Sequence, residues 1–170
     1  MMSIPTASPN VPPRSSFVTV VAWIVIASTL RGQEPHVAGN APADRPQATD
    51  SAHWARMDSA MAPYVAQARA SYPGAKQRYL AGLPHDQSLF VTGRLSDDRG
   101  YREQVFLAVD SIRDTLVYGR IWSAIVVVHG YRLRQAYAAA ESAVLDWLIT
   151  KPDGTEEGNV VGKFLDTYHP

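Results

Sequence analysis

The chain has 170 residues, in which 16 basic and 16 acidic side chains cancel and cysteine is absent. Its hydrophobic fraction of 46% is typical of a folded protein, and its length is enough for one domain with a tail. The neutral charge lacks the basic excess of a nucleic-acid-binding domain. The absence of cysteine excludes disulfides, thiolate zinc sites and thiol nucleophiles.

The N-terminal region predicts export from a bacterial cytoplasm. Residues 17–30 carry no charge, and this length matches the roughly 7–15 apolar residues of a signal peptide but not the roughly 20 of a membrane-spanning helix. A cleavage pattern lies at residues 41–43, and cleavage nearer Ser28 or no cleavage are alternatives. We expect residues 1–32 to be a signal peptide or an N-terminal membrane anchor, and the protein to be periplasmic or tethered to the inner membrane facing the periplasm. The alternative is a buried strand or core helix of a cytosolic fold.

A linker and a single folded domain are expected after this leader. Residues 33–49 are interrupted by Pro35, Pro42 and Pro46 and contain little that could be buried, which is typical of a flexible linker. Residues 50–170 then form one domain.

The first element of this domain is a predicted helix. Pro63 is compatible with it because the proline lies in the first turn. We expect Pro73-Gly74 to end the helix and a shorter amphipathic turn to follow at residues 76–81. The apolar residues that recur at helical spacing are Met61, Val65, Ala68 and Tyr72.

From Ser88 onward the apolar residues alternate, which is typical of β-strands. The alanine-rich stretch 136–144 has helical propensity, but we favour a strand at its start, a helical turn near residues 141–144 and a closing hairpin. The domain is therefore α+β: an N-terminal helix packed on a curled antiparallel sheet of about five to seven short strands, with a partly open barrel as a variant. The other expected strands span residues 89–95, 101–110, 115–122, 125–128, 145–150 and 160–165.

This region resembles a known family. The resemblance covers about residues 58–168, and its most specific part is Leu145-Asp146-Trp147 ahead of a glycine-bearing turn. The chain is similar there to the YegJ-like family of bacterial domains, also called domain of unknown function 2314. Members often carry an export leader, but the resemblance transfers no activity and no catalytic residues. The chain departs from the family at Leu133-Arg134, where a glycine is expected. The other matching segments are residues 66–70, Phe90 and Phe106, residues 119–122 and residues 162–164.

The first candidate for function is a group of aromatic and basic residues around one turn. Arginine and tyrosine are enriched at binding hot spots, so an exposed group of this kind suits an acidic or aromatic partner. In the alternative, the rings pack inward and the arginines form a solvated face. The residues are Trp122, His129, Tyr131, Arg132, Arg134 and Tyr137.

The second candidate is the pair Asp146-Trp147, where an acidic group beside an indole on a pocket wall binds a cation or a sugar. In the alternative, Trp147 anchors the core and Asp146 accepts hydrogen bonds from a neighbouring turn. An enzymatic variant uses Asp146 with His129 or Glu141. The sequence has no nucleophile elbow and no paired histidines at helical spacing, so it predicts no catalytic residues.

The leading hypothesis is a non-enzymatic interaction module that binds a protein or envelope component through residues 122–137. The alternatives are a small hydrolase or carbohydrate-active enzyme and an immunity or inhibitor protein. Asp153, Glu156 and Glu157 surround a glycine, but their spacing differs from a calcium-binding loop and favours a solvated hairpin tip. We expect no metal, no cofactor and no nucleic acid, and contact with a membrane only through an uncleaved leader.

Overall fold

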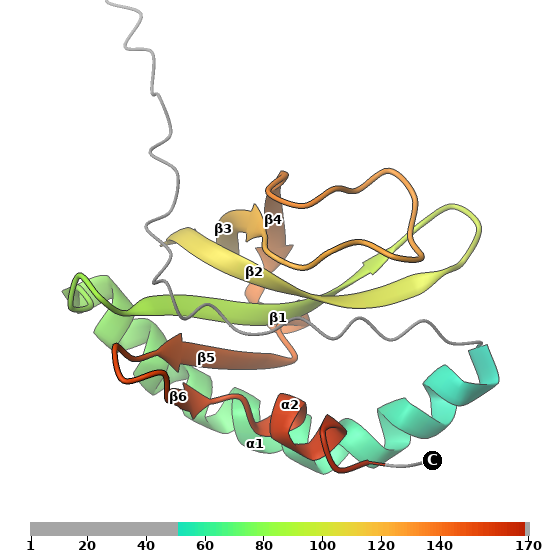
Figure 1. Cartoon of the computed structure of the whole chain (residues 1–170), viewed down its shortest axis with the longest axis horizontal. Helices are drawn as coiled ribbons and strands as arrows, with labels where there is room; N and C mark the ends of the chain where they lie inside the picture. The colour runs from blue at the N-terminus through green and yellow to red at the C-terminus, as the bar shows by residue number, and fades with distance from the viewer. Residues whose placement is uncertain (1–50, 169–170) are drawn as a thin grey trace, which may run out of the picture. The chain divides into compact units, whose positions relative to one another are not determined.

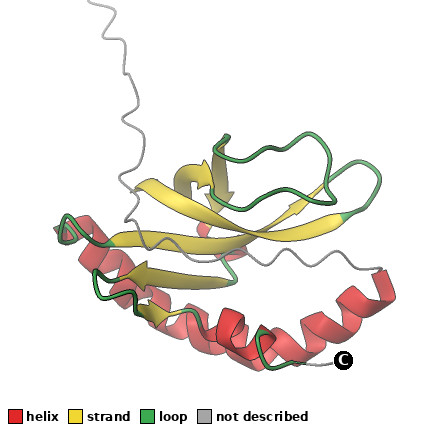
Figure 2. Cartoon of the chain, viewed as in Figure 1, coloured by secondary structure: helices red, strands yellow, loops and turns green. Residues whose placement is uncertain are grey.

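The computed structural model describes residues 51–168, in which one long helix runs along an antiparallel sheet (Figure 1 and Figure 2). The helix, α1 (Ser51–Ala81), comes first in the chain. The elements that follow are β1 (Ser88–Ser96), β2 (Arg102–Arg113), β3 (Leu116–Ile121), β4 (Ala136–Ala140), the 3-10 turn η1 (Glu141–Ala143), β5 (Asp146–Thr150), β6 (Glu156–Gly158) and the short helix α2 (Val160–Leu165).

The sheet has six strands in the order β4-β3-β2-β1-β5-β6, and each neighbouring pair is antiparallel. Strands β1 to β4 form a meander, whereas β5 returns to pair with the free side of β1. The α+β class and the N-terminal helix on an antiparallel sheet, both predicted from the sequence, are confirmed. The sheet is open, with β4 and β6 at its edges, and is not closed into a barrel.

Helix α1 begins at Ser51, so Pro63 lies inside the helix and not in its first turn as predicted. The helix also continues through Pro73, so the helix end predicted there and the separate turn predicted after it are wrong. A proline inside a helix costs about 3 kcal/mol because it removes a backbone hydrogen bond and its ring crowds the preceding turn. Pro73 is exposed, whereas Tyr72 and Ala75 are buried in the same apolar cluster. Packing on both sides of the proline therefore keeps this segment helical. The helix ends before Gly82, which has a φ of +99°.

The strands predicted up to residue 122 are confirmed, and so is the pattern of residues 136–150. The alanine-rich stretch becomes β4 followed by the turn η1, and β5 follows as expected. Strand β2 contains an irregularity between Val109 and Ser111 that shifts its register with β3. Local patterns and turn residues were therefore sufficient to predict five of the strands, although β4 has an alanine-rich sequence of helical propensity.

Two predicted strands are wrong. Residues 125–128 belong to the loop between β3 and β4, because a side chain binds their backbone N–H groups, as described below. Residues 160–165 form α2, and the strand that forms a hairpin with β5 is β6. Val161, Phe164 and Leu165 have helical spacing and pack against the first half of α1. Their apolar character therefore reflects a helix face and not a strand.

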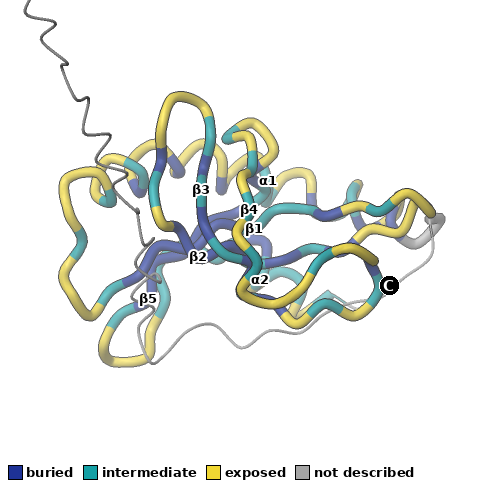
Figure 3. Tube along the Cα trace, turned by 90° about the horizontal axis from the view of Figure 1, so that it is seen from above, coloured by how far each residue is buried: buried dark blue, intermediate teal, exposed yellow. Residues whose placement is uncertain are grey.

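Two apolar clusters lie along α1. The larger one joins its second half to the inward side chains of the sheet, and Trp147 on β5 is part of it. The indole N–H of Trp147 donates to the Ala68 carbonyl oxygen at 3.1 Å and to Ser71 Oγ at 3.0 Å, which fixes the helix to the sheet. The smaller cluster joins the first half of α1 to α2, where the rings of Tyr64 and Phe164 stack at 4.3 Å. Figure 3 shows the resulting pattern, with buried residues along the central strands and exposed ones in the loops.

The predicted leader at residues 1–32 and the predicted linker at residues 33–49 lie outside the described residues. Within residues 51–168, no helix has both the length and the apolar character that crossing a membrane requires.

Two glycines test where α1 ends. Gly74 lies inside the helix with open space where a Cβ would be placed, whereas Gly82 has a positive φ. We expect Gly74→Ala to raise the free energy of unfolding by about 1 kcal/mol, because alanine is the better helix former. Gly82→Ala lowers it by about 1 kcal/mol, because an L side chain is strained at positive φ. Urea unfolding followed by circular dichroism measures both changes, and no gain from Gly74→Ala would place the end of the helix at Pro73.

Candidate binding site

We call residues 122–135, between β3 and β4, the basic loop. It lies close to the tip of the hairpin formed by β1 and β2 (Figure 1). Three polar contacts hold these two segments together although they are far apart in sequence. They are Arg99 Nη2 to the Val127 carbonyl oxygen at 3.1 Å, the His129 N–H to Asp97 Oδ2 at 3.1 Å, and the Tyr131 hydroxyl to the Ser96 carbonyl oxygen at 3.2 Å.

One buried carboxylate holds the basic loop from inside. Glu103 on β2 is fully buried, and its two oxygens accept hydrogen bonds from three consecutive backbone N–H groups. The donors are Val126 and Val127, both at 2.9 Å, and Val128 at 3.2 Å. Such charge-assisted bonds contribute about 1.5–3 kcal/mol each and offset the cost of burying the carboxylate. Because these donors are already bound, the segment does not join the sheet.

A second carboxylate, that of Asp97, organises the hairpin tip. It accepts hydrogen bonds from the N–H groups of Arg99, Tyr101 and His129 and forms an ion pair with the Arg99 guanidinium at 2.7 Å. Burial favours the neutral form of Asp97, but the guanidinium and the N–H groups outweigh this effect and lower its pKa to about 2. Asp97 is therefore charged at neutral pH and keeps the tip and the basic loop in contact.

The aromatic residues of the first candidate group divide between two clusters. Tyr131 and Tyr137 lie edge to face, with ring centroids 6.1 Å apart, and pack on the cluster that contains Val128. Trp122 instead lies 6.3 Å from the ring of Phe90, in a different cluster. All three candidate rings are partly buried, so they act first as packing residues beneath the loop.

The basic residues of the same group are exposed. His129, Arg132 and Arg134 all face solvent on the basic loop. Two apolar side chains accompany them, since Leu133 is 49% and Val126 is 59% exposed. The accessible surface of the loop is therefore cationic with two apolar side chains.

Arg134 has an unusual backbone conformation. Its φ is +65°, in the left-handed region that costs a non-glycine residue about 1–2 kcal/mol. Its guanidinium lies 5.2 Å from the centre of the Trp122 ring, within the range of a cation–π contact. This is the turn in which the family resemblance leads one to expect a glycine, and the conformation explains why glycine would fit there.

Asp146 and Trp147 lie apart from the basic loop, and both are buried. Trp147 is the core anchor described above. Asp146 is 1% exposed, and its oxygens accept from the N–H groups of Trp147 at 2.8 Å and of Val161 at 2.7 Å. Burial raises the pKa of Asp146, while these N–H groups act in the opposite direction. The carboxylate therefore binds the start of α2 and does not face an open pocket.

The three groups of the enzymatic hypothesis have separate neighbours. Asp146 binds α2, the N–H of His129 binds Asp97, and Glu141 accepts from Lys76 Nζ at 2.9 Å and from the Tyr72 hydroxyl at 3.1 Å. Burial and the nearby Glu141 carboxylate raise the pKa of Tyr72. These contacts do not bring Asp146 together with either proposed partner.

The three carboxylates near the β5–β6 turn also have separate roles. Asp153 accepts from Thr155 Oγ1 at 2.6 Å, Glu156 accepts from Asn159 Nδ2 at 2.7 Å, and Glu157 forms an ion pair with Arg78 at 2.7 Å. Within residues 51–168, no group of three metal-binding side chains is present.

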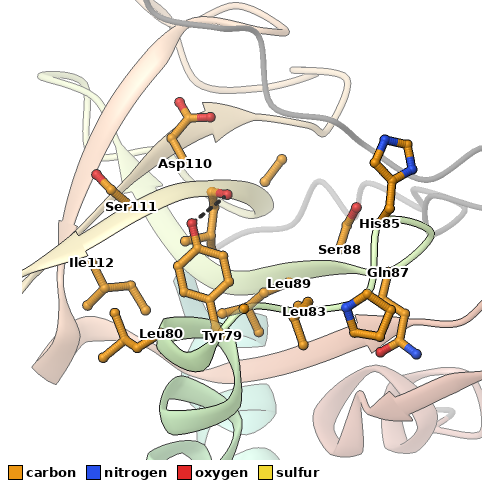
Figure 4. Close-up of a pocket in the computed structure, with 14 residues that line it drawn as sticks. Tyr79, Leu80, Leu83, His85, Gln87, Ser88, Leu89, Asp110, Ser111 and Ile112 are labelled. Atoms are coloured by element: carbon orange, nitrogen blue, oxygen red, sulfur yellow. Dashed lines mark hydrogen bonds between the residues drawn. The ribbon is translucent and has the colours of Figure 1, made fainter.

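One cavity of about 470 Å³ lies at the end of α1, next to the irregularity in β2 (Figure 4). Leucine and isoleucine side chains line much of it, and the Tyr79 hydroxyl donates to the Val109 carbonyl oxygen at 3.4 Å. Burial raises the pKa of Asp110 at its rim, although Arg120 opposes this. None of the candidate residues predicted from the sequence lines this cavity. Its other labelled residues are Leu80, Leu83, His85, Gln87, Ser88, Leu89, Ser111 and Ile112.

The sequence reasoning missed Glu103 and Asp97, the two carboxylates that support the basic loop. For Glu103 a signal was present. The alternation that places Val105 and Leu107 inward also places residue 103 inward, and an inward carboxylate in a strand needs donors. For Asp97 the turn composition predicted a bend but not its contact with His129.

No family model, curated protein or solved structure matches the chain. The resemblance to the YegJ-like family therefore stays a prediction, and function is argued from the site alone.

Glu103→Gln tests the support of the basic loop. The amide supplies one acceptor in place of two and turns an N–H₂ group toward backbone donors, so we expect the free energy of unfolding to fall by about 3 kcal/mol. Hydrogen exchange at residues 126–128 is expected to accelerate by more than at the central strands. Glu157→Gln, which removes only an exposed ion pair with Arg78, is the matched control and costs less than about 1 kcal/mol. Unchanged exchange at residues 126–128 would show that Glu103 does not hold the loop.

Proposed function

We propose that the protein is a non-enzymatic interaction module of the cell envelope, and that its basic loop binds an acidic surface of a partner protein. The observation that carries this proposal is the arrangement of Arg132, Arg134 and His129, which are exposed together on a loop fixed by buried carboxylates. The location in the envelope rests on the sequence of residues 1–32.

The fixed backbone of the loop supports a binding role. Ordering a loop at an interface costs free energy, so a loop that is already held loses less on binding. Glu103 and Asp97 together bind four consecutive N–H groups of the loop, from Val126 to His129. The arginines follow directly after this fixed segment, which limits how far they can move.

The distribution of charge also supports an acidic partner. The carboxylate of Glu103 is buried, and the Asp97 side chain is 2% exposed, so neither neutralises the outer surface of the loop. Asp98 at the hairpin tip is the exposed exception. The exposed Arg132 and Arg134 match the composition of binding hot spots, in which arginine is enriched.

Reversing the two arginine charges tests the proposal. We expect Arg132→Glu with Arg134→Glu to reduce capture of acidic envelope proteins by about tenfold or more, because attraction becomes repulsion. The charge-matched control is Arg56→Glu with Lys163→Glu, two exposed positions on α1 and α2. Capture from an envelope extract is quantified by mass spectrometry, and melting temperatures establish that all variants are folded. Equal capture by both double variants, or no capture by the wild-type chain above blank resin, would contradict the proposal.

Replacing Arg134 alone separates stability from binding. Arg134→Gly relieves the left-handed strain, so we expect the free energy of unfolding to rise by about 1 kcal/mol while capture of the partner falls. Asp114→Gly is the control, since Asp114 also has a positive φ of 55° but lies in the β2–β3 turn, and it leaves capture unchanged. Full capture by Arg134→Gly would remove Arg134 from the binding surface.

A further inference from the structure

The two edges of the sheet differ in how they are protected. At one edge, β6 has only three residues, two of them glutamates, and Lys163 Nζ donates to the Gly158 carbonyl oxygen at 2.8 Å. At the other edge, β4 has the sequence Ala-Tyr-Ala-Ala-Ala, with no charge and no proline. Charged residues, proline and bulges are the devices that keep a strand edge from pairing with another chain. Apart from its shortness, β4 has none of them.

The hydrogen bonds at the ends of β4 show which of its backbone groups point outward. The Ile121 N–H donates to the Gln135 carbonyl oxygen, and the Glu141 N–H donates to the Thr115 carbonyl oxygen. The Gln135 carbonyl oxygen and the Glu141 N–H therefore point toward β3. Because this direction alternates along a strand, residues 137 and 139 do the same, and the other three point away from the sheet. Those three are Ala136, Ala138 and Ala140.

The outward groups of β4 have room for a partner strand. Ala136, Ala138 and Ala140 are exposed, and the alternation along β4 turns their backbone groups away from β3. Their methyl side chains leave the approach to the edge unobstructed. Three N–H and three C=O groups are thus available in the pattern that a new strand requires.

The charges near β4 indicate what kind of strand would bind. Arg132 and Arg134 precede the strand, whereas Arg120, opposite Ala136 on β3, already forms an ion pair with Asp110 at 3.9 Å. At the other end, the Glu141 carboxylate already binds Lys76 at 2.7 Å. The end of the edge beside Arg132 and Arg134 is therefore basic, and the carboxylate at the other end, Glu141, is already neutralised by Lys76.

We propose that β4 is a docking edge to which an extended peptide segment of a partner protein adds as a further strand, with acidic residues at the end that lies beside Arg132 and Arg134. This inference rests on the proposed function and names the form in which the acidic partner binds. Backbone hydrogen bonds to residues 136–140 hold the peptide, and the arginines select its charge.

A second copy of the chain fits the edge less well. If two β4 strands paired antiparallel, the arginines of one copy would lie beside residues 140–142 of the other, where Glu141 is already bound to Lys76. If they paired in parallel, the arginines of both copies would lie next to each other and repel. An acidic peptide brings carboxylates next to the two arginines, whereas a second copy brings none that is not already bound.

The experiment uses a displayed library of random peptides about ten residues long, which is enough to cover a strand of this length. Peptides are selected on the immobilised full chain and then measured against variants. We expect the enriched peptides to lack proline in the paired segment and to carry Asp or Glu at one end. They bind Ala138→Pro about tenfold more weakly, because proline removes an outward donor, and they bind Ala138→Val as well as the wild-type chain.

The variants separate the possible failures. Proline is tolerated where the N–H of an edge strand faces solvent, so we expect Ala138→Pro to fold. If its melting temperature falls, Ala138→Glu replaces it, since an added carboxylate repels the acidic end without removing a backbone group. If binding is lost with the charge reversal of Arg132 and Arg134 but kept in Ala138→Pro and Ala138→Glu, the docking edge is wrong and the proposed function stands. If the charge reversal has no effect, both are wrong.

Two further outcomes also overturn the inference. No enrichment of peptides over the uncoated support would show that the edge does not accept a strand. A concentration-dependent dimer in sedimentation that Ala138→Pro abolishes would assign the edge to a second copy.

Discussion

The Glu103 carboxylate determines what the chain does after β3. Residues 125–128 are apolar enough to form a strand, and as a strand they would have to satisfy their N–H groups in the sheet. The buried carboxylate accepts three of these N–H groups instead, so the segment stays a loop and the sheet ends at β4. The exposed arginines lie on this loop, and β4 is the open edge of the sheet. Both features of functional interest therefore follow from the hydrogen bonds that Glu103 accepts from the loop.

The fold could be predicted wherever local pattern decided the structure. Strands β2 and β3 alternate between buried and less buried residues, and the segments from β1 to β5 are separated by turn residues. These signals act over a few residues. The errors occur where a distant partner decides. Pro73 stays helical because Tyr72 and Ala75 pack against the sheet, and residues 160–165 form α2, whose first N–H groups bind Asp146. Neither partner is visible in the local sequence.

In the candidate site, too, the sequence predicted what local composition decides and not what contacts with distant residues decide. Composition alone drew attention to the turn around residues 122–137, and its arginines are exposed, which both the binding hypothesis and its alternative require. Tyr131 and Tyr137 pack inward, as the alternative hypothesis had it, but the sequence could not decide between packing and binding because an aromatic residue serves equally well for either. For Trp147 and Asp146 the packing reading describes the structure, since each side chain satisfies its polar atoms inside the domain.

Backbone strain distinguishes Arg134 from the other residues in similar conformations. In the described part of the chain, three residues other than glycine have positive φ: Asp114, Arg134 and Asn159. Aspartate and asparagine adopt this region with little penalty because their short polar side chains bond locally, whereas arginine gains no such compensation. Glycine at position 134 would give the same turn without strain. A costly side chain in a position where glycine is sufficient is expected where the side chain itself is needed, and here it places a guanidinium over Trp122 at the basic end of β4.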